Sequence, residues 1–362
     1  MRTDLRESIE KFSDEEVKPL RESMDKEDVF PKHMWKRLGD MGLLGITVEE
    51  EFGGMGLGYY EHCIATEELS KANGALGLSY LAHSNLAVNQ LRLNGSQAQK
   101  EKYLPDLITG DKVGSLAMSE PNSGSDVVSM QLKAEKKGDK YVLNGSKMWI
   151  TNGPSADLII VYAKTDLQAG HKGISTFLVE KGTPGFSVAQ KLDKLGMRGS
   201  ETGELVFEDC AIPEENLMGQ EGQGVYILMK GLDYERLILG AGALGIAQAA
   251  MDEALLYTSD RKQFNTSLIG MPMIQAKLAD MYTTVQASRS FLYQGATMFD
   301  AGLKSNTDSA AIYLHNSRAA VQVADECIQL FGGNGYINEY PCGRYWRDAK
   351  LYDIGGGTKE IR

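Results

Sequence analysis

The spacing of apolar residues changes twice along this chain of 362 residues, and that change is what most constrains its fold. Up to about residue 112, apolar side chains recur every three to four positions, which is the spacing of amphipathic helices. The next stretch has short alternating runs separated by turn residues, which is typical of strands. Long helical patterns then return. The sequence therefore predicts an α+β fold with helical residues 1–112, β residues 113–222 and helical residues 223–362.

Several elements are predicted within this outline. Leu5, Ile9 and Phe12 recur at helical spacing between charged residues. The Asn144-Gly145 pair is a strong hairpin signal and predicts a turn between two strands. Strands are expected over 140–143, 147–151, 158–163, 174–180 and 204–208. Further helices are expected over 59–71, 231–258, 273–303 and 309–330.

Composition narrows the class of protein. The net charge of −11 argues against a nucleic-acid partner, which requires a basic surface. The sequence has no apolar run of about 18 residues, so no membrane span is expected. The four cysteines show no CxxC or Cys/His spacing, which predicts free thiols in a reducing compartment and no metal site. They are Cys63, Cys210, Cys327 and Cys342.

Two segments carry most of the chemical information. The first is LAMSEPNSGSD at 116–126, and the second is MWITNG at 148–153. Together they offer an aromatic face, a hydroxyl two residues further on, and a run of small residues with backbone amides. A flat heterocycle with polar edges requires such groups. The alternative for Trp149 alone is an ordinary core aromatic residue.

Both segments resemble the flavin-binding signature of the acyl-CoA dehydrogenases, and the resemblance covers essentially the whole chain. It implies FAD and three domains: N-terminal helices, a β-barrel-like middle domain and a C-terminal four-helix bundle. Trp149 would flank the isoalloxazine ring, and the Thr151 hydroxyl would hydrogen-bond flavin N5. The other expected contacts of this half of the cofactor are Leu116, Met118 and Ser119 at the pyrimidine edge, Ile150 beside Trp149, and Gly124 and Ser125 toward the pyrophosphate and substrate.

The resemblance implies a second group of FAD contacts. Arg261 would bind the pyrophosphate of a neighbouring subunit, a role that suits a guanidinium. The alternative for this charged stretch is a solvated helix end, and for the later glycine cluster a plain helix C-cap. Pro272 stands where many relatives have a glutamine near the adenine. The remaining expected contacts are Phe264, Gln329, Leu330, Phe331, Gly332, Gly333, Thr358, Lys359 and Glu360.

The catalytic base is displaced relative to many relatives. Those proteins carry a glutamate in a turn near the C-terminus, and this chain has Gly356 there. In isovaleryl-CoA dehydrogenases and some long-chain relatives the base lies on an earlier helix, and Glu235 occupies the matching position. The alternative is a surface ion pair between Glu235 and Arg236. The loss at Gly356 favours Glu235 as the base.

The expected substrate contacts surround this base. Gly356 would donate its backbone N–H to the thioester carbonyl. Tyr226 is an acyl or CoA contact or, alternatively, a buried helical tyrosine. The loop residues His171 and Lys172 correspond to a CoA-contacting stretch. The other expected contacts are Ser125, Asp233, Tyr234, Arg236 and Gly357.

The resemblance implies oxidation of isovaleryl-CoA to 3-methylcrotonyl-CoA in leucine breakdown, with electrons passed to electron-transfer flavoprotein. A homotetramer is implied as well. The alternatives are a long-chain or other branched-chain acyl-CoA dehydrogenase and a catalytically silent flavoprotein scaffold. The expected location is the mitochondrial matrix in a eukaryote and the cytoplasm in a bacterium.

Overall fold

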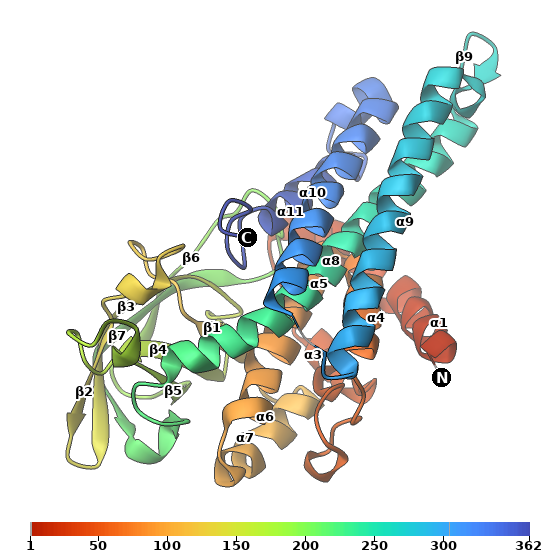
Figure 1. The fold of residues 1–362 in the computed structure, drawn as a ribbon. Coiled ribbons are helices and arrows are strands. Elements are labelled where there is room, and N and C mark those ends of the chain that lie inside the picture. The colour runs from red at the N-terminus through yellow and green to blue at the C-terminus, as the bar shows by residue number, and fades with distance from the viewer. Residues whose placement is uncertain (1, 304) are drawn as a thin grey trace.

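The molecule is an elongated helical body with a sheet at one end (Figure 1). The structure is a computed structural model in which residues 2–303 and 305–362 are described. In the first helix, Ile9 and Phe12 are buried, as their spacing predicts. The helices of the N-terminal region are α1 (Arg2–Phe12), α2 (Arg21–Glu27), α3 (His33–Asp40), α4 (Tyr59–Ala72), α5 (Gly74–Leu81), α6 (Gln90–Asn94) and α7 (Gln97–Thr109).

The middle of the chain forms one eight-stranded sheet. Its order is β6-β7-β3-β2-β4-β5-β8, and β1 pairs in parallel with β4. The predicted barrel-like region is therefore a mixed sheet in which β1 begins, and β3 ends, near the helical residues 79–87. The strands are β1 (Gly114–Ala117), β2 (Lys133–Lys137), β3 (Lys140–Thr151), β4 (Leu158–Lys164), β5 (Ile174–Glu180), β6 (Phe186–Lys191), β7 (Thr202–Pro213) and β8 (Leu217–Met218).

The hairpin predicted at Asn144-Gly145 is wrong. One continuous strand, β3, passes through this pair, and both of its halves pair with β7. The register shifts between Leu143 and Gly145, and Gly145 has φ 141°, so the glycine serves an irregularity in the strand. Asn144 is tied to β7, since its Oδ1 accepts from Asp209 N at 2.9 Å. The turn between β2 and β3 lies at Gly138 instead.

The C-terminal region is a bundle of long helices. Four helices form it: α8 (Gly224–Asp260), α9 (Pro272–Asp300), α10 (Asn306–Phe331) and α11 (Cys342–Tyr352). A short hairpin of β9 (Lys262–Gln263) and β10 (Thr266–Ser267) joins α8 to α9. Pro272 occupies the first turn of α9, where its missing N–H and fixed φ are tolerated.

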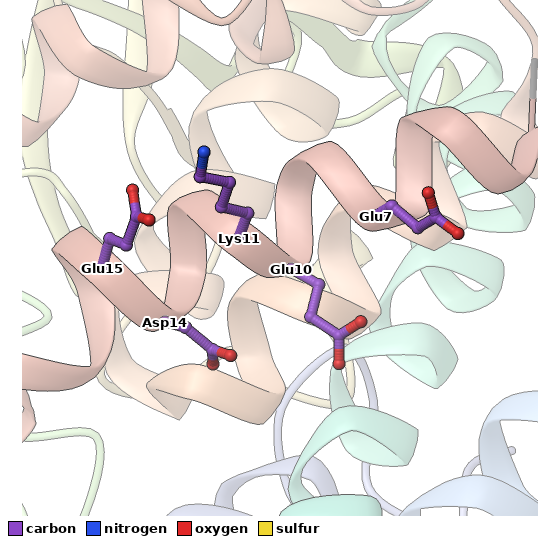
Figure 2. Close-up of a pocket in the computed structure, with 5 residues that line it drawn as sticks. All are labelled: Glu7, Glu10, Lys11, Asp14 and Glu15. Carbon is purple, nitrogen blue, oxygen red and sulfur yellow. The ribbon is translucent and has the colours of Figure 1, made fainter.

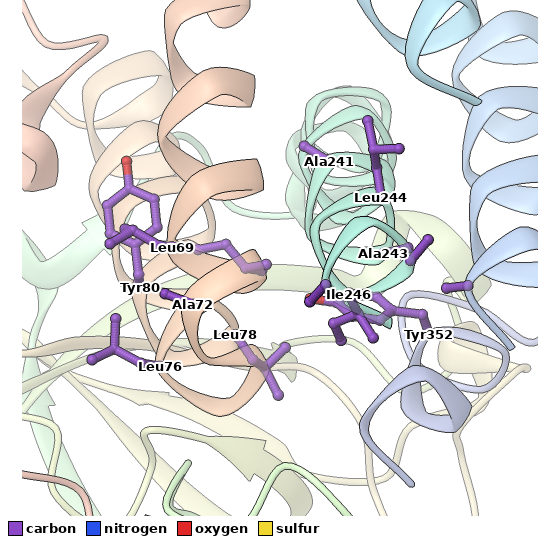
Figure 3. Close-up of a cluster of buried hydrophobic side chains, with 14 of the residues drawn as sticks. Leu69, Ala72, Leu76, Leu78, Tyr80, Ala241, Ala243, Leu244, Ile246 and Tyr352 are labelled. Atoms are coloured by element: carbon purple, nitrogen blue, oxygen red, sulfur yellow. The ribbon is translucent and has the colours of Figure 1, made fainter. Parts of the chain in front are cut away.

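A core of small and branched side chains joins α8 to the N-terminal helices (Figure 3). Leu69 and Ala72 of α4 face Ala241, Leu244 and neighbouring residues of α8, all fully or almost fully buried. The first turns of α8 are buried by a different cluster, which includes Ile160 and Tyr162 of the sheet. The middle of α8 is thus fixed in the bundle while its N-terminal part rests on the sheet.

Candidate active site

Trp149 is presented outward at the end of β3. Its side chain is 54% exposed, whereas the adjacent Ile150 is 3% exposed. The backbone of Trp149 has φ 62°, an uncommon angle for a bulky residue, which turns the indole away from the alternation of the strand. A Cβ placed on Gly124 would lie 3.9 Å from Cζ3 of this indole. An exposed aromatic face beside an unobstructed glycine fits a flat ring such as that of FAD.

Of the predicted pyrimidine-edge residues, Leu116 lies on β1, and Met118 and Ser119 directly follow this strand. β1 ends at Ala117, and Ser119 O accepts a hydrogen bond from Met148 N at 2.9 Å. Ser115 Oγ donates to Thr151 O at 2.6 Å, which joins β1 to the end of β3. The structure therefore brings the two motifs of the sequence together along one edge.

Glu235 and Gly356 meet, although they are far apart in the sequence. A Cβ placed on Gly356 would lie 3.4 Å from Oε1 of Glu235, and 2.5 Å from Leu239 Cδ1. Gly356 has φ 63°, in the left-handed region that favours glycine. The turn where many relatives carry the glutamate therefore packs directly against the helical carboxylate in this chain.

The surroundings of Glu235 favour its protonated form. Its side chain is partly buried on α8 and is enclosed by protein, and this desolvation raises the pKa of Glu235 to about 7. Arg236 and Arg362 oppose the rise through their positive charges. The buried Tyr162 lies close enough for Glu235 to raise the pKa of its phenol further. A carboxyl group with a pKa near 7 suits general-base chemistry at neutral pH.

Arg362 fixes the glycine turn from behind. Its Nε donates to Gly357 O at 2.7 Å, and its guanidinium donates to Tyr352 O at 2.6 Å and to Ser317 Oγ at 3.0 Å. The same guanidinium lies 3.7 Å from the centre of the Tyr313 ring. Tyr313 in turn donates its hydroxyl to Gly355 O at 2.8 Å. These bonds hold a turn that glycine flexibility would otherwise leave loose.

The other predicted substrate residues have different surroundings. Tyr234 stacks on Tyr59 with ring centres 4.4 Å apart. Asp233 is buried against the start of α10, where the Asn306 amide, turned with its nitrogen inward, lies 2.7 Å from the carboxylate. Tyr226 is 67% exposed in the first turn of α8, so the alternative of a buried tyrosine is wrong.

The two loop residues predicted to contact CoA are exposed. His171 and Lys172 lie on the short turn Gly170–Gly173 before β5. This turn adjoins the start of α8, since a Cβ placed on Gly222 would lie 2.6 Å from Lys172 O. Ser125 is exposed as well.

Most of the second group of predicted FAD residues lies at the opposite end of α8. Arg261 directly follows this helix, 26 residues after Glu235, which corresponds to about 39 Å at the rise of an α-helix. Arg261 and Phe264 are exposed, Phe264 by 91%. Phe331 stacks on Tyr257 with ring centres 3.8 Å apart. Figure 1 shows the β9 hairpin at the far tip of the bundle, away from the sheet.

The remaining residues of these predictions divide between the two ends. Gln329, Gly332 and Gly333 are exposed at the end of α10, and Leu330 is buried there. Thr358 and Lys359 are partly buried beside the glycine turn, where Lys359 N donates to Asp353 O at 3.1 Å, and Glu360 is exposed. Within one chain, the end of β3 is joined to residues 115–119 and Glu235 lies beside Gly356, whereas Arg261 lies at the other end of α8.

Sequence reasoning missed three residues that support this site. They are Tyr162, Arg362 and Lys147. Lys147 is fully buried on β3, where its Nζ donates to Met118 O at 2.8 Å. The sequence shows Lys147 two residues before Trp149, but a lysine on a predicted strand is expected to be exposed. Tyr162 and Arg362 gave no local signal because their contacts are made by distant segments.

Other features of the molecule lie outside this region. A depression of about 420 Å³ is lined by five residues of α1 and the turn after it, four of them acidic (Figure 2). Across residues 2–303 and 305–362, no cluster of His, Cys, Asp or Glu is arranged to hold a metal ion. Among the helices of that same described part, none combines the length and apolar character needed to cross a membrane.

Family models match almost all of the chain. They describe the N-terminal domain of acyl-CoA dehydrogenases over residues 2–111, the middle domain over 115–210 and the C-terminal domain over 222–362. A rice (Oryza sativa subsp. japonica) protein named isovaleryl-CoA dehydrogenase, mitochondrial, is 58% identical over 99% of this chain and 88% of its own length.

Two further matches widen the comparison. A potato (Solanum tuberosum) protein named 2-methylacyl-CoA dehydrogenase, mitochondrial, is 56% identical over 99% of this chain and 87% of its own length. A chain in a solved structure of the electron transferring flavoprotein of Acidaminococcus fermentans superposes with a TM-score of 0.98 at 38% identity. That match covers 99% of this chain and 95% of the other.

Proposed function

The chain belongs to the acyl-CoA dehydrogenase family, and on this premise we propose that it oxidises isovaleryl-CoA to 3-methylcrotonyl-CoA. The protein is an FAD-dependent acyl-CoA dehydrogenase that resembles isovaleryl-CoA dehydrogenases. The observation that carries the proposal is the contact between Glu235 and Gly356. It supports a base that has moved from the turn to the helix.

Glu235 acts as the general base in this proposal. Its carboxylate removes a proton from Cα of the thioester, and the electron pair left behind forms the Cα–Cβ double bond. Bound FAD supplies the acceptor for the hydride that leaves Cβ. The backbone N–H of Gly356 donates to the thioester carbonyl, which acidifies the α-proton. Trp149 and Thr151 would hold the flavin ring, with Leu116, Met118 and Ser119 at its edge.

The identity of the substrate rests on relatedness and on the site of the base. The rice relative at 58% identity supports isovaleryl-CoA. The potato 2-methylacyl-CoA dehydrogenase at 56% identity supports a second candidate, an acyl-CoA that carries its branch on Cα. A long-chain substrate is the third alternative, because a helical base also occurs in that branch of the family.

Several wider features follow as proposals. The rice and potato relatives are both named as mitochondrial, which supports the mitochondrial matrix for a eukaryotic source. The similarity to a chain in a structure of an electron transferring flavoprotein supports such a flavoprotein as electron acceptor. The exposed Arg261 and Phe264 support a homotetramer in which a second copy completes the FAD site.

The Glu235→Gln variant tests the base. Removal of a general base lowers the rate by about 10²–10⁴-fold, and the variant should keep its yellow FAD. Asp252→Asn is the matched control, since Asp252 is an exposed carboxylate on the same helix that accepts from Gln248 at 2.6 Å. If Glu235→Gln turned over substrate at the rate of the parent, the assignment of the base would be wrong.

Anaerobic titration with several thioesters tests the substrate. Isovaleryl-CoA should bleach the flavin at lower concentration and faster than isobutyryl-, 2-methylbutyryl- or palmitoyl-CoA. Preferential bleaching by palmitoyl-CoA or by 2-methylbutyryl-CoA would replace the proposed substrate with the corresponding alternative. A yellow protein that no acyl-CoA bleaches would instead be a silent scaffold.

A further inference from the structure

Lys147 is a buried cation at the centre of the predicted FAD-binding edge. Its side chain has no exposed surface, and it projects from β3 two residues before Trp149. Its Nζ donates to Met118 O at 2.8 Å and to Glu120 Oε1 at 2.9 Å, and it contacts Met130 Sδ at 3.7 Å. Burial lowers the pKa of Lys147 to about 8, against the opposing charge of Glu120.

Glu120 is held in place by backbone groups of another strand region. Its Oε2 accepts from Gln131 N at 2.6 Å, and its Oε1 accepts from Leu132 N at 3.0 Å. Both residues lie just before β2. Glu120 is only 5% exposed, so the pair with Lys147 is shielded from solvent. The ammonium group is thus fixed between a braced carboxylate and the Met118 carbonyl.

Two residues of β3 donate hydrogen bonds to two successive carbonyl groups of the segment 116–126. The Lys147 side chain holds Met118 O, and the backbone N–H of Met148 holds Ser119 O at 2.9 Å. A buried ion pair is a poor source of stability, because well-packed apolar residues often replace one at no loss. Its presence directly behind residues 118–119 therefore points to a role beyond stability.

We propose that Lys147 is a positioning residue for the cofactor, which fixes the backbone of Met118 and Ser119 at the flavin edge and places a positive charge behind it. This inference rests on the proposed FAD contacts of Met118 and Ser119. The reduced flavin is richer in electrons than the oxidised flavin. The part of the Lys147 charge that Glu120 does not cancel therefore stabilises the reduced form and raises the reduction potential.

The Lys147→Met variant separates this role from plain packing. Methionine keeps an unbranched chain of similar length but removes the charge and the donor to Met118 O. We expect FAD to bind the apoprotein about tenfold more weakly. We also expect the reduced cofactor to lose a further tenfold in affinity relative to the oxidised one, which for a two-electron couple lowers the midpoint potential by about 30 mV.

Two further variants complete the experiment. Met130→Leu removes only the sulfur contact of Nζ and should leave both the FAD dissociation constant and the potential unchanged. If Lys147→Met does not fold because Glu120 is left without its cation, the double variant Lys147→Met, Glu120→Gln still lacks the donor to Met118 O and takes its place in the FAD-binding measurement, where about tenfold weaker binding is expected; because both charges are removed together, its potential should stay that of the parent. Apoprotein fluorescence titration gives the dissociation constant, and dye equilibration gives the potential.

The outcomes separate this inference from the proposed function. A folded variant that keeps the FAD affinity and the potential of the parent overturns the positioning role. In Lys147→Met, weaker FAD binding at an unchanged potential also overturns the proposal, because it would make Lys147 a structural support only. Neither result depends on which acyl-CoA is oxidised, which the thioester titration and Glu235→Gln decide independently.

Discussion

The two ends of α8 carry two sets of predicted functional residues, and they differ in what surrounds them. Near its N-terminal end, Glu235 is enclosed by the chain's own glycine turn and by the charges of Arg236 and Arg362. At its other end, Arg261 and Phe264 project from an exposed two-stranded hairpin. The proposed base is therefore surrounded by groups of its own chain, whereas Arg261 and Phe264 at the far end are exposed and available to a second molecule.

This difference gives the long helix a purpose. A helix of 37 residues spans about 55 Å, which exceeds what one flavin site requires. We infer that the helix supports the chemistry of its own subunit at one end and the cofactor of a neighbouring subunit at the other. The variants below test each end and then the connection between them.

Among the variants that leave Glu235 unchanged, the largest effect is expected from filling the glycine turn. In Gly356→Glu, the new Cβ would lie 2.5 Å from Leu239 Cδ1 and 3.1 Å from Tyr313 Cε1, on a backbone with φ 63°. The turn and Glu235 must then shift, and a displacement of about 1 Å at a reacting group can lower the rate about 100-fold.

Steady-state kinetics with isovaleryl-CoA measures this loss. Gly343→Ala is the control, because a Cβ placed there meets nothing within 4 Å. A Gly356→Glu, Glu235→Gly double variant with the parent's rate would contradict the distinction between the two ends of α8. The near end of α8 would then be dispensable as the source of the base.

The sequence alone led to the hypothesis that Glu235 replaces a glutamate that is absent at Gly356. The three regions of the fold were also visible in it, because apolar periodicity reports directly on helices and strands. Many relatives have a glutamate where this chain has Gly356, and Glu235 on the earlier helix offers a carboxylate in its place. Their contact in space agrees with that interpretation, although residue types alone could not give the packing of Leu239 and Tyr313 around it.

Other features depend on tertiary contacts and were predicted wrongly or not at all. Asn144-Gly145 has the local chemistry of a tight turn, but continuous pairing of both flanks with β7 overrides it. The burial of Lys147 follows from Glu120 and Met118, which belong to another segment. Arg362 holds the glycine turn through carbonyls from two helices and the turn itself.

The second prediction concerns the pH dependence of the near end. Because burial raises the pKa of Glu235 to about 7, the ionised base is lost as the pH falls through 7. We expect kcat/KM to fall about tenfold from pH 8 to pH 6, with a single apparent pKa. A flat profile across this range would contradict a buried carboxylate as the base.

The raised pKa of Glu235 also affects the free energy of unfolding, and here the loss occurs as the pH rises, not as it falls. The folded protein holds the Glu235 proton more tightly than the unfolded chain, so this stabilising contribution is complete below the unfolded pKa and is lost as the pH rises through 7. Glu235→Gln should therefore be more stable than the parent at pH 8, by at most about 3 kcal/mol. Denaturant unfolding should show a larger difference at pH 8 than at pH 5, which lies just above the ordinary pKa of glutamate.

The smallest effect is expected at the far end. Arg261→Ala should weaken FAD binding about tenfold, the value of one lost hydrogen bond between charged groups. Lys262→Ala is the matched control, since Lys262 is the next residue of the same exposed hairpin. Equal losses in the two variants would indicate general electrostatics of the hairpin, and would remove Arg261 as a specific contact.

Mixing two defective chains tests whether the ends of α8 serve different subunits. Co-expressed Glu235→Gln and Arg261→Ala chains can form a site with an intact base from one chain and an intact arginine from the other. Random association in a symmetric pair makes about one quarter of the sites intact. Activity at limiting FAD should then exceed that of either variant alone. If each site drew both residues from one chain, mixing would restore nothing, and the separation of about 39 Å along α8 would have to be bridged within a single molecule.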